Sequence, residues 1–189
     1  MPFAGPPGQP PTLLESLVPL LHASFHPLGA AVAEAVTLPG QALISLVLVL
    51  AAAWRLWTSG RGESALAWPA AWVLATGVEL VFRHTLSRPP LYRDGVHVPG
   101  FDSSWPSGHA LRCAIVAAAL AVAWPRLLFP LVAWLGAAVA LLVLAGFHTP
   151  TDVAGGLLLA TVVLAGVAVL SRSGFLRGRA GLRGPRPRA

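Results

Sequence analysis

The sequence is poor in the charged residues that water-soluble domains display. Charged residues make up 11% of its 189 positions, none of them is lysine, and all 13 basic residues are arginine. Soluble domains carry about 25% charged residues on average, so the composition argues against an ordinary soluble fold. Because arginine fills every basic position, an arginine where a relative has lysine can reflect composition rather than function.

Cysteine is also nearly absent. Cys113 is the single cysteine and lies inside an apolar run. One thiol excludes an internal disulfide and any metal cluster built on cysteines. The redox compartment is therefore left open.

Apolar residues dominate instead, at 56% of the chain with a mean hydropathy of +0.71. The length fits one domain. Five apolar segments come near the roughly 20 residues that a helix needs to cross the hydrocarbon core; they are Leu38–Trp57, Ala65–Phe82, Ala110–Trp124, Leu127–Phe147 and Val153–Leu170. We therefore expect an all-α fold, a polytopic membrane helical bundle with five transmembrane helices. The segment Ala110–Trp124 is long enough only if its helix begins near Ser107.

The N-terminal part of the chain differs from these spans. Residues 1–12 are rich in proline and glycine, lack the features of a signal peptide, and are expected to be disordered. In Leu13–Val36 polar residues such as Glu34 interrupt the apolar ones, which favours helices lying in the membrane interface. We expect no cleaved leader, a membrane domain over residues 13–171 and a basic cytoplasmic tail over residues 172–189.

Basic residues are concentrated in that tail. The last 18 residues hold Arg172, Arg177, Arg179, Arg183, Arg186 and Arg188. The sequence pI of about 11.5 is therefore largely a property of the tail. A basic segment beside a membrane span is explained by topology and by contact with anionic headgroups, so no nucleic-acid partner is expected.

The positive-inside rule orients the chain. A cytoplasmic tail, counted back span by span, also puts Arg55, Arg61 and Arg126 in the cytoplasm. The loop Arg83–Ser107 and the turn His148–Asp152 then lie on the outer face of the cell membrane. The loop holds three arginines against the rule, and an anionic ligand would explain why they are kept there.

The third apolar segment begins with Pro106-Ser107-Gly108-His109. We interpret this motif as a helix N-terminus whose free backbone amides form an anion site. Ser107 adds a hydroxyl donor and Gly108 allows close approach, so a phosphate group fits. The alternative is that Pro106 and Ser107 only start the helix and that His109 is an interfacial side chain.

The last apolar segment begins with His148-Thr149-Pro150-Thr151-Asp152. Asp152, four residues after His148, can hold the imidazole in one tautomer and stabilise its charged form, leaving the other nitrogen free to attack phosphorus. The alternative is structural, since Thr149 and Asp152 also form a capping box around Pro150. The two roles can coexist.

Two arginines, Arg83 and Arg88, follow the end of the second apolar segment and lie five residues apart. Their guanidinium groups can clamp phosphate oxygens and stabilise charge on a transferring phosphoryl group. The alternative is that both side chains snorkel to the membrane interface.

In this order and spacing the three motifs resemble the type 2 phosphatidic acid phosphatase (PAP2) superfamily, whose motifs run K-x6-R-P, P-S-G-H and S-R-x5-H-x3-D. The likeness covers Arg83–Asp152, and the placement of the spans extends it to about Ala30–Leu170. The resemblance implies an integral-membrane lipid phosphatase without a metal or other cofactor. His148 would be the nucleophile that forms a phosphohistidine, Asp152 its partner, and His109 the acid that protonates the leaving alkoxide.

The first motif departs from the family pattern. If Arg83 takes the place of the family's lysine, Arg88 matches an arginine often found two residues before the R-P, whose own positions hold Pro90 and Leu91. If Arg88 begins the R-P instead, Val81 takes the place of the lysine. Either alignment lacks one basic group.

The third motif departs as well, because Leu141 and Leu142 occupy its S-R positions. Losing a charge-assisted phosphate contact typically costs several kcal/mol of transition-state stabilisation. Arg112, one helical turn after His109, is a candidate replacement, and Arg93 in the outer loop is a second.

Arg112 lies within a span, where an arginine needs an anionic partner. We expect its guanidinium to point between His109 and His148, close enough to share one phosphate with the other phosphate-binding candidates Arg83, Arg88, Ser107 and Gly108. The alternative is a structural ion pair with Glu79.

Two classes of function remain. The first is a lipid phosphatase that acts on a lipid phosphate or on a lipid or polyprenyl pyrophosphate, with the lipid tail between helices. The second is a non-catalytic membrane protein that binds anionic lipid headgroups in the same pocket. The missing arginines favour the second class, whereas an intact acid, nucleophile and partner carboxylate favour the first, since binding alone needs none of these three. No segment encodes which lipid is recognised.

Overall fold

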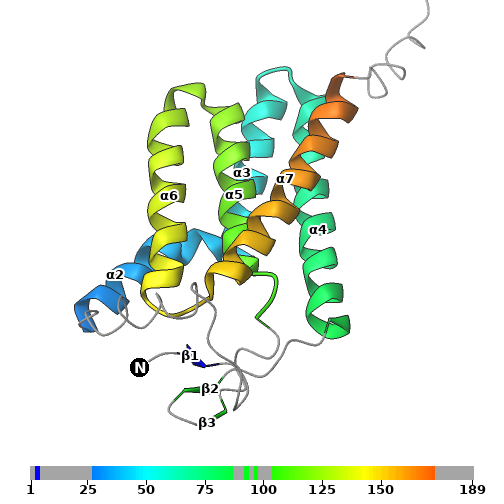
Figure 1. Cartoon of the computed structure of the whole chain (residues 1–189). Coiled ribbons are helices and arrows are strands. Elements are labelled where there is room, and N and C mark those ends of the chain that lie inside the picture. Colours follow the sequence, from blue (N-terminus) through cyan, green and yellow to red (C-terminus); the bar gives the residue numbers. More distant parts are fainter. Residues whose placement is uncertain (1–2, 5–26, 87–91, 94–95, 98–103, 173–189) are drawn as a thin grey trace, which may run out of the picture.

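The computed structural model describes residues 3–4, 27–86, 92–93, 96–97 and 104–172. Its helices are α2 (Pro27–Thr37), η1 (Leu38–Gly40), α3 (Ala42–Thr58), α4 (Gly62–Thr85), α5 (Gly108–Ala123), η3 (Pro125–Leu127), α6 (Leu128–Leu144) and α7 (Pro150–Arg172) (Figure 1). Three two-residue strands, β1 (Phe3–Ala4), β2 (Tyr92–Arg93) and β3 (Val96–His97), pair antiparallel in that order. The predicted all-α bundle is confirmed, with this small sheet as an unpredicted addition.

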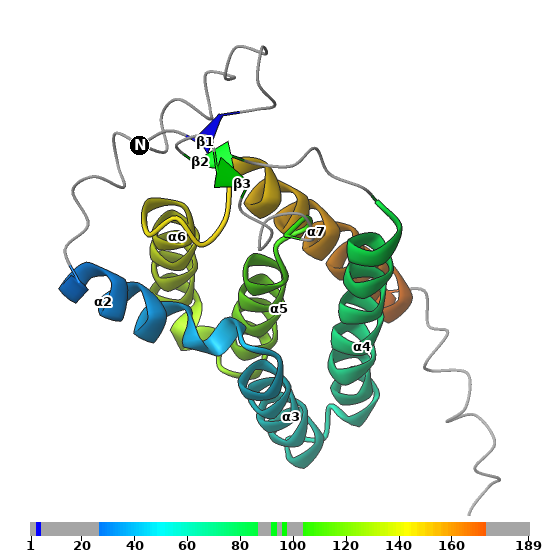
Figure 2. The same cartoon turned by 90° about the horizontal axis from the view of Figure 1, so that it is seen from below.

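Helix α5 forms the centre of the bundle. It packs against α3, α4, α6 and α7, which surround it (Figure 2). Leu111 and Ile115 of α5 are fully buried and contribute to a core that also includes Leu56 of α3. Burial on every side explains why the residues of α5 are apolar all round rather than along one stripe.

The outer surface of the bundle is apolar. Leu43 and Trp54 of α3 are 74% and 71% exposed, and Phe129 of α6 is 83% exposed. A protein in water rarely shows such a surface over several helices, whereas a membrane bundle places these side chains against lipid. The chain is therefore an integral membrane protein.

Three helices are long and apolar enough to cross a membrane, over Ser64–Thr85, Pro125–Leu144 and Pro150–Val169. A fourth crossing results if Ala31–Gly40 and Ala42–Thr58, which are bent by 51° relative to each other, act as one span. Helix α5 has 16 residues, or about 24 Å at 1.5 Å per residue, which is short of the hydrocarbon core. The predicted count of five spans is therefore not confirmed among the described residues, and the short one is the segment whose length already looked marginal.

Helix α2 lies across one end of the bundle and joins α3 through η1 (Figure 1). The bend is set by Leu38-Pro39-Gly40, and Gly40 approaches α5 so closely that an added Cβ would lie 2.9 Å from the carbonyl oxygen of His109. That α2 lies in the membrane interface stays a prediction. Residues 13–26 of that predicted segment, most of residues 1–12 and the tail beyond Arg172 lie outside the described residues.

The bundle has two distinct ends (Figure 1). One end holds the α3–α4 turn with Arg61, the α5–α6 turn with Arg126, and the C-terminal end of α7. The opposite end holds α2, the N-terminal ends of α5 and α7, and the C-terminal end of α4 with Arg83. The arginines that the sequence assigned to opposite sides of the membrane thus lie at opposite ends of the bundle. Which side of the membrane each end faces stays a prediction.

Candidate active site

The N-terminus of α5 is capped by Ser107. Its side-chain oxygen accepts a hydrogen bond from the amide of Ala110 at 3.3 Å, and its own amide donates to the backbone oxygen of Asp152 at 2.9 Å. The second bond joins the start of α5 to the start of α7. Ser107 is fully buried, so the predicted helix start is also a contact point between two helices.

Two glycines of α7 make that contact possible. An added Cβ would collide with the backbone oxygen of Ser107 at Gly156 and with the indole of Trp105 at Gly155. The Trp105 ring in turn stacks on Phe82 of α4, with ring centroids 5.8 Å apart. Small residues on α7 therefore let the loop before α5 lie directly on the helix that carries Asp152.

The start of α7 forms the capping box that the sequence allowed. The amide of Thr149 donates to Asp152 Oδ2 at 3.0 Å, and the amide of Asp152 donates to Thr149 Oγ1 at 3.3 Å. Asp152 is fully buried, and its Oδ2 also accepts a hydrogen bond from Ser104 Oγ at 3.0 Å. These hydrogen bonds fix the position of the carboxylate.

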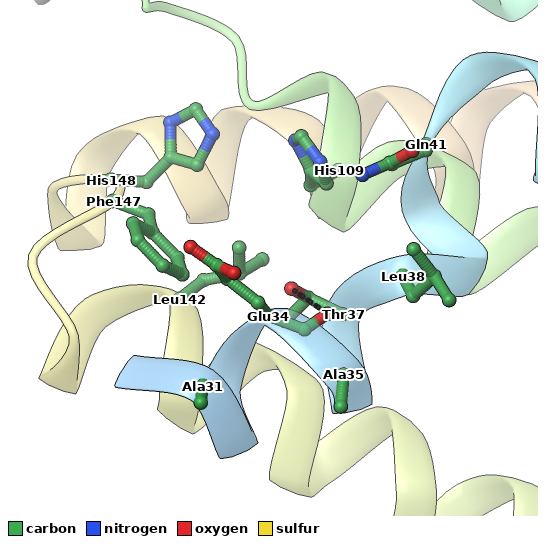
Figure 3. Close-up of a pocket in the computed structure, with 10 residues that line it drawn as sticks. All are labelled: Ala31, Glu34, Ala35, Thr37, Leu38, Gln41, His109, Leu142, Phe147 and His148. Carbon is green, nitrogen blue, oxygen red and sulfur yellow. Dashed lines mark hydrogen bonds between the residues drawn. The ribbon is translucent and has the colours of Figure 1, made fainter. Parts of the chain in front are cut away.

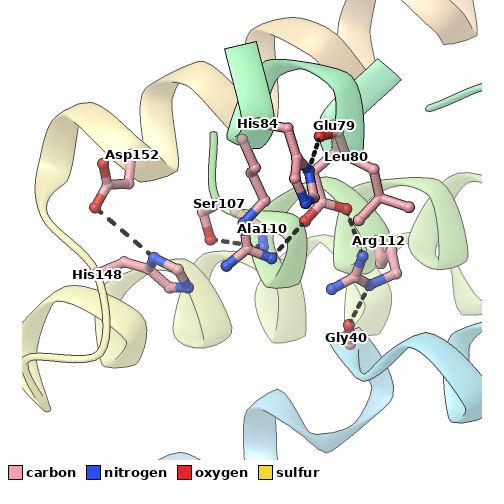
Figure 4. Close-up of polar contacts among 10 residues, drawn as sticks. Gly40, Glu79, Leu80, His84, Ser107, Ala110, Arg112, His148 and Asp152 are labelled. Carbon is pink, nitrogen blue, oxygen red and sulfur yellow. Dashed lines mark hydrogen bonds and ion pairs between the residues drawn. The ribbon is translucent and has the colours of Figure 1, made fainter. Parts of the chain in front are cut away.

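His148 is brought to this carboxylate by the turn after α6. Gly146 has a φ of 71°, a conformation that side chains other than glycine rarely adopt, and the amide of His148 then donates to the backbone oxygen of Leu142 at 3.0 Å. His148 Nδ1 lies 3.8 Å from Asp152 Oδ2 (Figure 4). This separation exceeds a hydrogen bond, and His148 Nδ1 is buried without a hydrogen-bond partner among the described residues. Catalytic contacts of this kind often tighten only when substrate is bound.

The two histidines of the predicted site are neighbours in space. The ring centroids of His109 and His148 are 6.0 Å apart, with 51° between the ring planes. Both rings line one cavity of about 730 Å³. Two imidazoles facing one space are the arrangement that a nucleophile and a separate acid require.

An ion cluster lies beside the N-terminus of α5. Glu79 of α4, whose side chain is 1% exposed, accepts hydrogen bonds from Arg112 Nη1 at 2.6 Å and from Arg83 Nη1 at 3.2 Å. Arg112 Nε also donates to the backbone oxygen of Gly40 at 2.7 Å (Figure 4). Arg112 thus connects α5 both to α4 and to the bend between α2 and α3.

This cluster overturns the expected orientation of Arg112. The guanidinium pairs with Glu79 instead of pointing between His109 and His148, so the structural ion pair is the arrangement present. A buried arginine without a carboxylate is costly, which explains why the pair forms across two helices. The phosphate-binding role expected for Arg112 stays a prediction.

Gly108 has a reason to be glycine that the sequence did not reveal. An added Cβ there would collide with the carboxylate of Glu79 and with Arg112 Nη2. In the structure, the group that lies close to Gly108 is the carboxylate of Glu79. The approach of a substrate phosphate to the same residue remains a prediction.

The cavity also has a wall that the motifs did not identify. It is lined by Ala31, Glu34, Ala35, Thr37, Leu38, Gln41, His109, Leu142, Phe147 and His148. Figure 3 shows the Glu34 carboxylate directed from α2 toward the space below the two histidines, and the Gln41 amide directed toward His109. The only sequence signal for Glu34 was an acid interrupting an apolar segment, and nothing pointed to Gln41.

The described site thus brings together most of the predicted residues. His109, His148, Asp152, Ser107 and Gly108 lie at the ends of α5 and α7 that meet. Arg83 lies at the same end of the bundle and is bound to Glu79. Arg88 lies outside the described residues, and of Arg93 only the backbone, in β2, is described.

The comparisons with known proteins agree with this arrangement. No curated protein and no solved structure matches the chain. A family model described as the PAP2 superfamily matches residues 62–173, which is more than half of the chain and includes both histidines, Asp152, Ser107 and Arg83. The chain therefore belongs to the PAP2 superfamily.

Proposed function

We propose that this membrane protein is a lipid phosphatase that acts through a phosphohistidine. The observation that carries the proposal is the pair of imidazoles, with ring centroids 6.0 Å apart, that lines one cavity while a buried carboxylate lies behind His148. Membership of a superfamily of phosphatase-type proteins supports the same class of reaction.

In the first step, His148 attacks phosphorus through Nε2, because Nδ1 faces Asp152. The bond from nitrogen to phosphorus forms as the bond from phosphorus to the lipid oxygen breaks, and His109 donates its proton to the leaving alkoxide. Asp152 stabilises the positive charge that develops on the His148 ring.

In the second step, water attacks the phosphohistidine. His109, now neutral, accepts a proton from that water as the bond from nitrogen to phosphorus breaks. Inorganic phosphate leaves and both histidines return to their starting states. Each residue thus acts twice in opposite directions, and no further reactant is needed.

Phosphate oxygens need donors during both steps. The proposed donors are Ser107 and the amides at the N-terminus of α5. Arg83 would add a guanidinium by exchanging Glu79 for phosphate. Arg88 stays a predicted ligand. We further propose that this end of the bundle faces the outside of the cell and that the C-terminus is cytoplasmic.

A second function retains support from one observation. Arg112 is held by Glu79, which favours a site in which the loss of the family arginines is not compensated. A protein that only binds anionic lipid headgroups would tolerate that loss, since it stabilises no transition state.

Phosphate release separates the two functions. Purified protein in detergent is incubated, with a metal chelator present, with phosphatidic acid, phosphatidylglycerophosphate and a polyprenyl pyrophosphate. We expect release from at least one lipid by the wild type and none by His148→Ala. No release by a folded wild type that still binds these lipids would favour the binding protein, and normal turnover by His148→Ala would remove His148 from the mechanism.

A further inference from the structure

The cavity that joins the two histidines extends toward α2 and not only along α5 and α7. Its lining includes Glu34, Thr37 and Gln41 from the α2–η1–α3 region, together with His109 and His148 (Figure 3). Helix α2 is held over the cavity by a hydrogen bond from Trp134 Nε1 of α6 to the backbone oxygen of Val36 at 3.0 Å. The acid on α2 therefore belongs to a fixed wall of the site.

We expect the leaving group to occupy this part of the cavity. In a displacement at phosphorus, the attacking and leaving groups lie roughly in line, so a substrate attacked by His148 extends away from that ring. The remaining lining is largely apolar, with Ala31, Ala35 and Leu38 on one side and Leu142 and Phe147 on the other, which suits a lipid chain. The group that joins this chain to the reacting phosphorus then passes Glu34.

The charge of that wall is negative. Among the described residues that line the cavity, Glu34 is the one acid and none is an arginine. Arg83 and Arg112, the guanidinium groups described at this end, are bound to Glu79. A second phosphate group on the α2 side of the cavity would thus meet the carboxylate of Glu34, whereas Arg83 is proposed to bind the phosphate that reacts.

Lipid monophosphates and lipid pyrophosphates differ in the group that leaves when phosphorus is attacked. A lipid monophosphate releases an alcohol, which is neutral once His109 has donated its proton. A lipid pyrophosphate releases a lipid phosphate, which stays anionic after the bond from the bridging oxygen to phosphorus breaks. Like charges repel within about 10 Å at moderate ionic strength, so Glu34 opposes the second leaving group and not the first.

We propose that Glu34 makes this site select lipid monophosphates over lipid pyrophosphates. The inference rests on the proposed phosphatase function and adds its substrate class. Gln41, whose amide is directed toward His109, is a neutral neighbour that can hydrogen-bond the leaving oxygen of either substrate.

The test compares a polyprenyl monophosphate and a polyprenyl pyrophosphate of the same chain length, in neutral detergent at low salt. The measured quantity is the ratio of kcat/KM for the two lipids. We expect the wild type to favour the monophosphate, and Glu34→Gln to shift the ratio toward the pyrophosphate by about threefold to tenfold, as expected for removal of one partly solvated charge.

Two matched variants and a salt titration separate the effect of the Glu34 charge from the effect of its shape. Glu34→Asp keeps the carboxylate and should keep the preference, whereas Gln41→Glu adds a carboxylate to the same cavity and should strengthen it. Rising salt should weaken the preference of the wild type, which a purely steric effect would not do.

The outcomes are distinct. A ratio that is unchanged in Glu34→Gln, or a wild type that favours the pyrophosphate, overturns this inference and leaves the phosphatase proposal standing. Absence of release from every lipid monophosphate and pyrophosphate overturns the proposed function and this inference with it.

Discussion

Replacing Glu79 by glutamine should destabilise the protein strongly, because the residue balances a buried arginine. The side chains of Glu79 and Arg112 are 1% and 9% exposed, and their closest atoms are 2.6 Å apart. Glutamine keeps the size of the side chain and removes only its charge. Arg112 would then stay buried with the backbone oxygen of Gly40 as its remaining described partner.

The expected loss of stability depends on which of the two arginines bound to Glu79 needs the carboxylate more. Removing one member of a buried ion pair typically costs about 3–5 kcal/mol, because an uncompensated charge is left behind. The contact of Glu79 with Arg83 is longer, at 3.2 Å, and the Arg83 side chain is 33% exposed. Such a partly exposed pair adds at most about 1 kcal/mol, so the loss should come almost entirely from Arg112.

The double variant Glu79→Gln with Arg112→Met tests this assignment. It removes the uncompensated charge and should recover most of the stability, ending within about 2 kcal/mol of the wild type. Arg61→Gln is a matched control, because the exposed Arg61 Nη1 donates to the backbone oxygen of Val122 at 3.1 Å and to no other described residue. That control should change the free energy of unfolding by less than about 1 kcal/mol.

The free energy of unfolding is measured in detergent by denaturant titration followed by circular dichroism. The reasoning is refuted if Glu79→Gln lies within about 1 kcal/mol of the wild type. It is equally refuted if the double variant is no more stable than the single one, since the cost would then not come from the charge of Arg112.

Three further predictions concern the chemistry and the topology. His109→Ala should slow release from lipid monophosphates far more than from an activated aryl phosphate, because only the poor leaving group needs a proton; equal losses in kcat for the two substrates would make His109 structural. Asp152→Asn should lower kcat by about 10²-fold or more while KM changes little, because the amide cannot stabilise the charged imidazole; an unchanged kcat would restrict Asp152 to capping. In a Cys113→Ala background, a membrane-impermeant thiol reagent applied to intact cells should label Thr85→Cys and spare Thr58→Cys, two exposed positions at opposite ends of the bundle; the reverse pattern would place the site in the cytoplasm.

The sequence predicted the helices well and their ends less well. Hydrophobicity located a span at Leu38–Trp57, but the helix α3 begins at Ala42, because Leu38-Pro39-Gly40 forms the bend. The last span was predicted from Val153, yet α7 begins at Pro150, where the capping box starts it. Helix ends are set by caps, prolines and glycines, whose effects hydropathy does not measure.

The candidate site was predictable where neighbours in the sequence carry it. His148 and Asp152 are four residues apart, and the helix N-terminus at Ser107 can be recognised from its motif. The partner of Arg112 was less predictable, because Glu79 lies 33 positions away on another helix. Pairing across helices depends on how the helices pack, so the sequence could offer Glu79 only as one of two alternatives.

The contacts of Asp152 are compatible with both interpretations of the motif His148–Asp152, as a helix cap and as a partner of His148. Its Oδ2 accepts hydrogen bonds from the amide of Thr149 and from Ser104 Oγ, and lies 3.8 Å from His148 Nδ1. The donors that cap α7 also fix the carboxylate in place, and under the proposed function a fixed carboxylate stabilises the imidazolium that develops on His148. The backbone oxygen of the same residue accepts a hydrogen bond from the amide of Ser107 and thereby connects the start of α7 to the N-terminus of α5, on which phosphate is proposed to bind. Under the proposed function, the contacts that start α5 and α7 therefore also set the distance between His148 and a phosphate bound at the N-terminus of α5.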